Sequence, residues 1–214
     1  MEKESQTIFD KNVIEFVTVA AEFCAFLERA ERMKRSDFVD TSLKILPLLY
    51  LKASMLPKCE TIGEEVLETY VTEEIYEILR INLAELMGDK DDYLDVFVQD
   101  MVYSDQPIKK SISEDLADIY QDIKDFVFQL GLNETMNDSL AVCQENFGML
   151  WGQKLVNTLR PLHDVKYSQQ DEEDNEEGFY EPSDDGNCCE DDECHCHDDD
   201  CHCHENGCHC HHDE

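Results

Sequence analysis

The residues with the clearest chemical potential lie near the C-terminus, where cysteine and histidine alternate. Three CHCH units occupy residues 194–197, 201–204 and 208–211, and each unit begins seven residues after the previous one. Thiolate and imidazole are the ligands that Zn²⁺, Cu⁺ and Ni²⁺ sites favour. The last 27 residues contain eight cysteines and seven histidines, and we predict that these residues are the metal ligands: Cys188, Cys189, Cys194, His195, Cys196, His197, Cys201, His202, Cys203, His204, Cys208, His209, Cys210, His211 and His212.

The spacing of these donors predicts an adaptable chelator instead of one rigid site. In an extended backbone, alternate side chains point the same way, so C-x-C and H-x-H each present two like ligands on one side. Zinc-finger spacing, with a core-forming segment between C-x₂-C and H-x₃-H, is absent from the sequence. We expect Zn, or alternatively Cu or Ni, to be bound in this segment, and no cofactor in the rest of the chain. Such a protein would buffer, sense or deliver the metal.

Two other interpretations of the cysteines remain open. The thiols could form oxidised crosslinks if the protein resides in an oxidising compartment. The segment could also be a low-complexity extension that has affinity for metal but no selected role.

The donors lie in a segment that has almost nothing to bury. Residues 168–214 contain no Leu, Ile, Val, Met or Trp, and 19 acidic residues without any Lys or Arg give this segment a net charge of −19. Such a segment cannot offset the entropy of its own ordering by burial. We therefore predict two parts: an all-helical domain over residues 1–167, and a disordered, acidic, metal-binding tail over residues 168–214, called the acidic arm below.

Charge and hydropathy exclude two classes of partner. Residues 1–167 carry 17 basic and 32 acidic residues, a net charge of −15, so neither part offers the cationic surface that nucleic acids require. The longest apolar run, Ile45–Leu51, is too short to span a bilayer, and the N-terminus does not resemble an export signal. We expect no nucleic-acid or membrane partner and a cytoplasmic location, where thiols stay reduced.

The elements that precede the arm are predicted to be helices. Apolar residues recur at helical spacing over 13–27, 37–56, 72–88, 91–104, 111–131 and from 133 to the proline at 161. The last two segments are predicted to bury these residues: Leu116, Ile119, Ile123, Val127 and Leu130 in the first, and Met136, Leu140, Cys143, Phe147, Leu150 and Leu155 in the second. Thr72 is a predicted N-cap, and Ser111 and Glu114 have capping-box spacing. Pro47 is expected to kink or split its helix, and Pro161 to end or bend the last one. The fold class is an all-α bundle of about six helices.

The helical part contains few residues that could carry catalysis. Cys24 and Cys143 fall on apolar stripes and are predicted to be core residues, while Cys59 is expected in a loop. His163 is the single histidine before the arm, so a di-iron site with two Glu-x-x-His motifs is not supported. Trp151 is predicted to anchor the core. We therefore expect a binding protein and not an enzyme.

An alternative function gives the helical domain the main role. In this interpretation the bundle is a protein–protein adaptor that captures a protein partner, and the arm is an accessory low-complexity tail. A pair formed by Cys59 and His163 through the fold would instead favour an enzyme.

Three stretches resemble a known family. "SEDLADIYQDIKDFVFQLG", "ENFGMLWGQKLVNTLRPLH" and "DVKY", which together span most of residues 113–167, resemble the bacterial family known as domain of unknown function 5063. The resemblance covers about residues 8–167 and implies an all-helical fold. It implies no activity, substrate or catalytic residue, and the acidic arm lies outside it.

Overall fold

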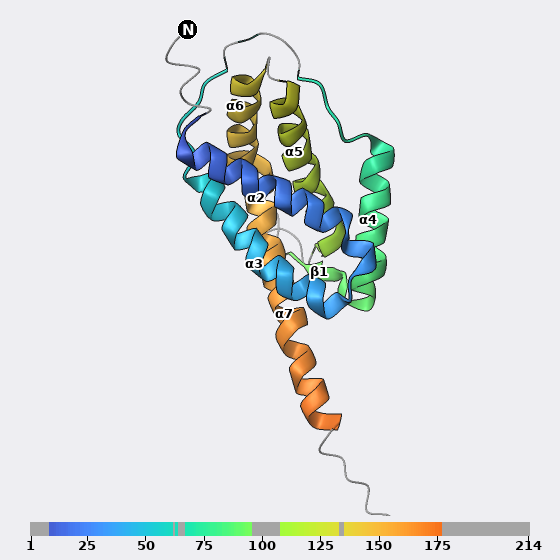
Figure 1. The fold of residues 1–214 in the computed structure, drawn as a ribbon. Coiled ribbons are helices and arrows are strands. Elements are labelled where there is room, and N and C mark those ends of the chain that lie inside the picture. The colour runs from blue at the N-terminus through green and yellow to red at the C-terminus, as the bar shows by residue number, and fades with distance from the viewer. Residues whose placement is uncertain (1–8, 62, 64–66, 96–107, 133–134, 177–214) are drawn as a thin grey trace, which may run out of the picture. The chain divides into compact units, whose positions relative to one another are not determined.

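The described part of the chain consists of helices and one small two-stranded antiparallel pair, and a long connection joins α3 to α4 (Figure 1). The computed structural model describes residues 9–61, 63, 67–95, 108–132 and 135–176. Its elements are α2 (Lys11–Glu28), η1 (Ala30–Arg32), α3 (Arg35–Ser54), α4 (Glu73–Met87), η2 (Gly88–Lys90), β1 (Asp92–Leu94), β2 (Lys109–Ser111), α5 (Ile112–Leu132), α6 (Met136–Asn146), η4 (Phe147–Trp151) and α7 (Gly152–Glu176). The predicted all-α class is therefore confirmed.

The chain separates into two compact units, Met1–Glu172 and Glu173–Glu214. Helices α2, α3, α4, α5 and α6 lie in the first unit, which contains the hydrophobic core. None of the described helices is long and apolar enough to cross a membrane.

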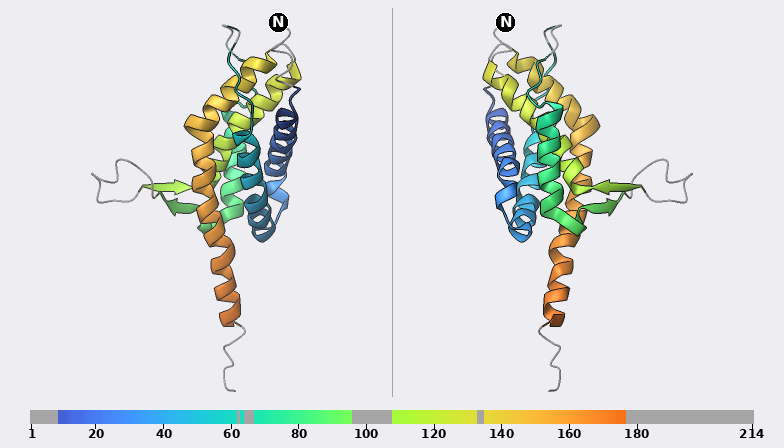
Figure 2. Two further views of the ribbon diagram at one scale, coloured as in Figure 1. Left: turned by 90° about the vertical axis from the view of Figure 1, so that its left-hand side faces the viewer. Right: turned by 90° about the vertical axis from the view of Figure 1, so that its right-hand side faces the viewer.

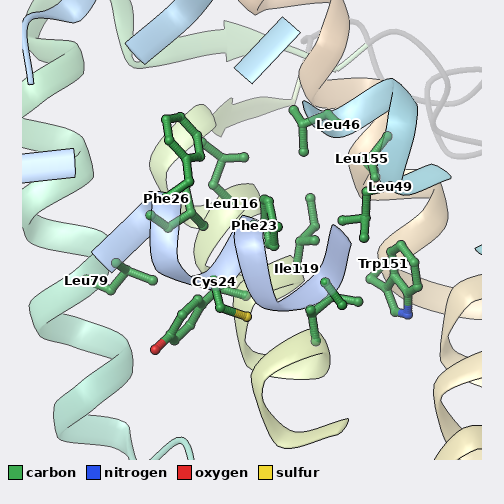
Figure 3. Packing of buried hydrophobic residues seen from close by; sticks show 14 of the residues in the cluster. Phe23, Cys24, Phe26, Leu46, Leu49, Leu79, Leu116, Ile119, Trp151 and Leu155 are labelled. Carbon is green, nitrogen blue, oxygen red and sulfur yellow. The ribbon is translucent and has the colours of Figure 1, made fainter. Parts of the chain in front are cut away.

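The core forms where α2 packs on α3 and α5, and α5 in turn packs on α4 and α6. Phe16 and Phe23 of α2 are fully buried, as the apolar stripe of this helix predicts. From α5, Leu116, Ile119 and Ile123 fill the same cluster, while the predicted Val127 and Leu130 are only partly buried against it. Figure 3 shows Phe23, Leu116 and Ile119 in this packing.

Local capping explains where several helices begin. The Asp10 side chain accepts a hydrogen bond from the Asn12 N–H at the start of α2 (2.8 Å). Thr72 accepts from the Ile75 N–H at the start of α4 (3.3 Å), which confirms the predicted N-cap. Ser111 accepts from the Glu114 N–H (3.4 Å). These bonds satisfy N–H groups that have no partner within the helix.

Helices α6 and α7 are joined by the π-helical turn η4 and form one continuous helical segment. A π-turn adds a residue to the helical repeat and so rotates the following side chains around the axis. Leu150, which the sequence pattern placed in the core, is consequently 50% exposed, while Trp151 and Leu155 are fully buried. The prediction for Leu150 was wrong because a regular α-helical repeat was assumed.

The prediction of a helix over residues 91–104 is wrong for the residues of this range that the structure describes, 91–95. Residues Asp92–Leu94 form β1, which pairs antiparallel with β2 (Figure 2). Tertiary contacts outweigh the helical pattern here: the Asp91 carboxylate accepts hydrogen bonds from the N–H (2.8 Å) and Oγ (2.6 Å) of Ser113. The remainder of the predicted helix, residues 96–104, lies outside the described residues.

Neither internal proline ends its helix. Pro47 lies inside α3 and Pro161 inside α7, and both helices continue on each side. The missing hydrogen bonds are tolerated because buried neighbours such as Leu46 and Leu162 hold the flanking turns against the core. Helix α7 extends to Glu176, into the acidic arm, since Gln, Glu and Asp can continue a helix and the next Gly or Pro is Gly178.

Candidate functional site

The predicted metal ligands cannot be placed. All fifteen, from Cys188 to His212, lie outside the described residues. Within the part of the chain that the structure does describe, no group of three or more His, Cys, Asp or Glu residues is arranged to hold a metal ion. The prediction that these cysteines and histidines bind metal therefore rests on the sequence alone.

Two of the three cysteines in the helical domain are core residues, as predicted. Cys24 and Cys143 are 2% and 3% exposed. Figure 3 shows the sulfur of Cys24 directed into the packed cluster. Burial raises the pKa of Cys24 to about 12 and also raises the pKa of Cys143, because the thiolate form is poorly solvated there. Neither thiol is available as a nucleophile at neutral pH.

Cys59 and His163 have different surroundings. The Cys59 thiol donates to Asn137 Oδ1 (2.9 Å), and partial burial raises the pKa of this thiol. His163 is exposed on α7, with its ring 4.5 Å from the ring of Tyr167. The contacts made by each residue thus give no support to a catalytic pair.

Trp151 anchors the core, as predicted. Its indole is fully buried, and its ring centroid lies 6.4 Å from that of Phe16 and 4.7 Å from that of Phe147. The indole N–H donates to the Cys143 carbonyl oxygen (3.3 Å), which satisfies its polar atom. This arrangement gives Trp151 a structural role.

A buried polar cluster connects the hairpin to α5 and α7. The Tyr93 hydroxyl donates to the Asp115 carboxylate, which also accepts from Thr158 Oγ1 (3.3 Å). Nearby, Lys110 Nζ lies 2.7 Å from an oxygen of Asp95. Burial raises the pKa of Asp115, although the hydrogen bond from Tyr93 opposes this effect. Because these groups satisfy one another, the cluster attaches the hairpin to the bundle.

A second polar region lies beneath the connection between α3 and α4. Part of this connection is held by α6, since Gln144 accepts from the Cys59 N–H (3.1 Å) and donates to the Pro57 carbonyl (2.6 Å). Figure 1 shows residues 57–61 and 67–71 passing α6 and α5. The connection is therefore fixed by side chains of helices that are distant in sequence.

Helix α5 holds the other part of the connection with two side chains one turn apart. Asp125 Oδ1 accepts from the N–H groups of Tyr70 (2.7 Å) and Val71 (2.8 Å). The Gln129 amide donates to the Glu68 carbonyl. Because residues four apart share a helix face, these bonds hold residues 68–71 along one side of α5.

A cavity of about 320 Å³ lies between α5, α6 and residues 67–69. It is called the roofed cavity below, and it is lined by Leu67, Glu68, Thr69, Gln121, Asp122, Asp125, Phe126, Gln129, Ser139, Val142, Cys143 and Asn146. The Asp122 carboxylate, at its wall, accepts from the Asn146 amide (2.7 Å). Burial raises the pKa of Asp122, and the Asn146 hydrogen bond partly offsets that rise.

Sequence reasoning did not identify the roofed cavity. A signal is nevertheless present, because Asp122, Asp125 and Gln129 follow one another at helical spacing beside the apolar face of α5. The signal could not be interpreted from the sequence, since a polar stripe on a helix normally faces solvent. In the folded chain this polar stripe is covered because the connection between α3 and α4 runs across it.

Comparisons with known proteins agree with the helical assignment. No curated protein matches the chain. The crystal structure of protein BF1032 from Bacteroides fragilis is similar, with 77% sequence identity and a TM-score of 0.67, and the match covers 76% of this chain and 96% of that one. The family model described as domain of unknown function, DUF5063, matches residues 7–168. Since this match includes nearly all of the helical part, the chain belongs to the DUF5063 family.

Proposed function

We propose that this protein binds a thiophilic metal ion, Zn or else Cu or Ni, through its acidic arm. The observation that carries the proposal is the threefold repeat of CHCH, which concentrates soft donors in a segment without a core of its own. Fifteen donors at about four per tetrahedral ion allow at most about three complete sites. The helical domain carries the arm, and metal ions are the partners.

The electrostatics of the arm support the same function. Its charge of −19 raises the local concentration of cations before any thiolate engages. Binding requires ionised thiols and neutral imidazoles, so protons leave as metal enters and affinity falls with decreasing pH. Bound metal would also neutralise part of the repulsion within the arm, which gives a route from metal occupancy to a more compact arm.

The helical domain offers little competition for soft metals. Of its three cysteines, Cys24 and Cys143 are buried and Cys59 is hydrogen-bonded to α6. Its single histidine, His163, contacts an aromatic ring. A role in binding, and not in catalysis, is therefore the function that we propose for the whole chain.

The test is a zinc titration of the reduced full-length protein, followed by native mass spectrometry. We expect the wild-type chain to retain zinc at micromolar concentration. The variant C194S/C196S/C201S/C203S/C208S/C210S should lose most of that zinc, whereas C59S should retain it. If the wild-type chain retains no ion under reducing conditions, or if the sixfold variant binds as well as the wild type, the proposal is wrong.

An adaptor role for the helical domain is the second candidate, and one surface feature favours it. Leu48, Leu51 and Met55 lie on one face of α3 and its C-cap, and each is more than 40% exposed. Apolar residues at this spacing are typical of helix faces that receive a partner. We would compare L51D with I78D, an equivalent change on α4, in pull-downs from the native cells. Loss of the same captured protein in L51D alone would support this role.

A further inference from the structure

The roofed cavity combines apolar surface with a few polar groups, although it lies among packed helices. Protein interiors are close-packed, and large internal voids are few. Gln129, Ser139 and Cys143, at 2–3% exposure, form its inner wall, while Glu68 and Thr69 lie exposed at its edge. A cavity of about 320 Å³ with a small number of polar groups falls in the size range of binding sites for small molecules.

The polar lining has a single sign of charge. Among the described lining residues, Glu68, Asp122 and Asp125 contribute carboxylates, and none is Lys, Arg or His. Asp125 already accepts hydrogen bonds from the backbone N–H groups of Tyr70 and Val71, in the connection that covers the cavity. Asp122 accepts from Asn146, and the charge of Lys154 also lowers its pKa. Lys154 forms its ion pair with Asp118, however, and no described cation lies within ion-pair distance of Asp122. A partly buried carboxylate of this kind is stabilised when a cation occupies the space beside it.

The remaining lining defines the kind of cation. Phe126, Val142 and Leu67 supply apolar surface, and an aromatic ring also attracts an organic cation. The amide oxygens of Gln121 and Asn146 and the hydroxyls of Thr69 and Ser139 can accept hydrogen bonds from N–H donors. The described carboxylates are not grouped as a metal site would require. An ammonium or guanidinium group attached to a short carbon chain matches this combination.

We propose that the roofed cavity binds a small organic cation, an alkylamine or alkylguanidine, with its charged end against Asp122 and its carbon chain against Phe126 and Val142. The roof would limit the length of the ligand, since Gln129 and Asp125 attach residues 68–71 to α5. This site is independent of metal binding by the arm.

The probe is 1,4-diaminobutane, titrated into the full-length protein by calorimetry at about 0.15 M salt, where screening weakens loose association with the arm. A local readout comes from the backbone amide resonances of Ser139 and Val142. D122N retains the acceptor for Asn146 and removes the charge, while V142F fills the cavity without changing any charge. E85Q makes the same charge change on the exposed face of α4 and is the matched control.

We expect one saturable site that shifts the Ser139 and Val142 resonances. Loss of one charge-assisted hydrogen bond predicts binding about ten- to a hundredfold weaker in D122N. V142F should abolish saturation, and E85Q should bind like the wild type. The proposal is overturned if the diamine associates only loosely with the whole acidic surface, if D122N binds as well as E85Q, or if the neutral 1,4-butanediol binds equally well.

Discussion

The side chain of Asp125 should contribute measurably to stability, because it holds the connection between α3 and α4. Its carboxylate oxygen accepts the N–H groups of Tyr70 and Val71. Val71 is 5% exposed and Tyr70 is 41% exposed. After D125A, the Val71 N–H would remain buried without an acceptor, whereas the Tyr70 N–H could regain water. Loss of the acceptor should therefore cost more free energy at Val71 than at Tyr70.

The magnitude follows from these exposures. A buried donor without a partner costs about 1–3 kcal/mol, and a donor that regains water costs about 0.5 kcal/mol. We expect D125A to lower the free energy of unfolding by about 2 kcal/mol. D125N retains a neutral acceptor and loses only the charge assistance, so it should cost about 1 kcal/mol.

The assay is urea unfolding followed by fluorescence of Trp151, which is the only tryptophan and is fully buried. The control is D92A, because it removes the same charge from a residue whose ion pair with Lys109 is exposed on both sides and should contribute about 0–1 kcal/mol. Equal losses in D125A and D92A would refute the reasoning. A loss in D125N as large as that in D125A would show that charge, and not the acceptor, holds the connection.

Two further predictions concern η4 and the contact between α3 and α7. The π-turn exposes Leu150 and buries Leu155. In the same urea assay, L155A should therefore destabilise the fold by about 2–5 kcal/mol and L150A by less than about 0.5 kcal/mol. Equal effects would contradict the rotation of the side chains around the helix axis at η4. Hydrogen bonds from Lys166 and then Lys44 lower the pKa of Asp40 from 3.8 to about 2. The contribution of the ionised Asp40 carboxylate to the stability of the folded state is therefore complete above about pH 4, and it is lost as the pH falls towards about 2. The urea midpoint should fall less steeply over that range in D40N than in the wild type, and parallel curves would exclude this contribution.

Much of the fold was predictable because helical periodicity reports burial directly. The stripes that contain Phe16, Phe23, Leu116 and Ile119 are buried as expected, and Thr72 caps α4. Errors occurred where backbone geometry departed from a regular helix. One extra residue in η4 moved Leu150 to the surface, and the contacts of Asp91 with Ser113 favoured a strand over a helix at Asp92–Leu94.

The sequence by itself determined the helical class, the family resemblance, and the charge and Cys/His composition of the acidic arm, because these depend on residue type and on local spacing. Tertiary structure alone decided which polar residues meet. Asp125 and Gln129 bond to residues 68–71, and Gln144 bonds to Pro57 and Cys59, across 54 to 87 positions of the chain. Spacing within one helix carries no information about such partners, and so the roofed cavity emerges only when the connection is packed against α5 and α6.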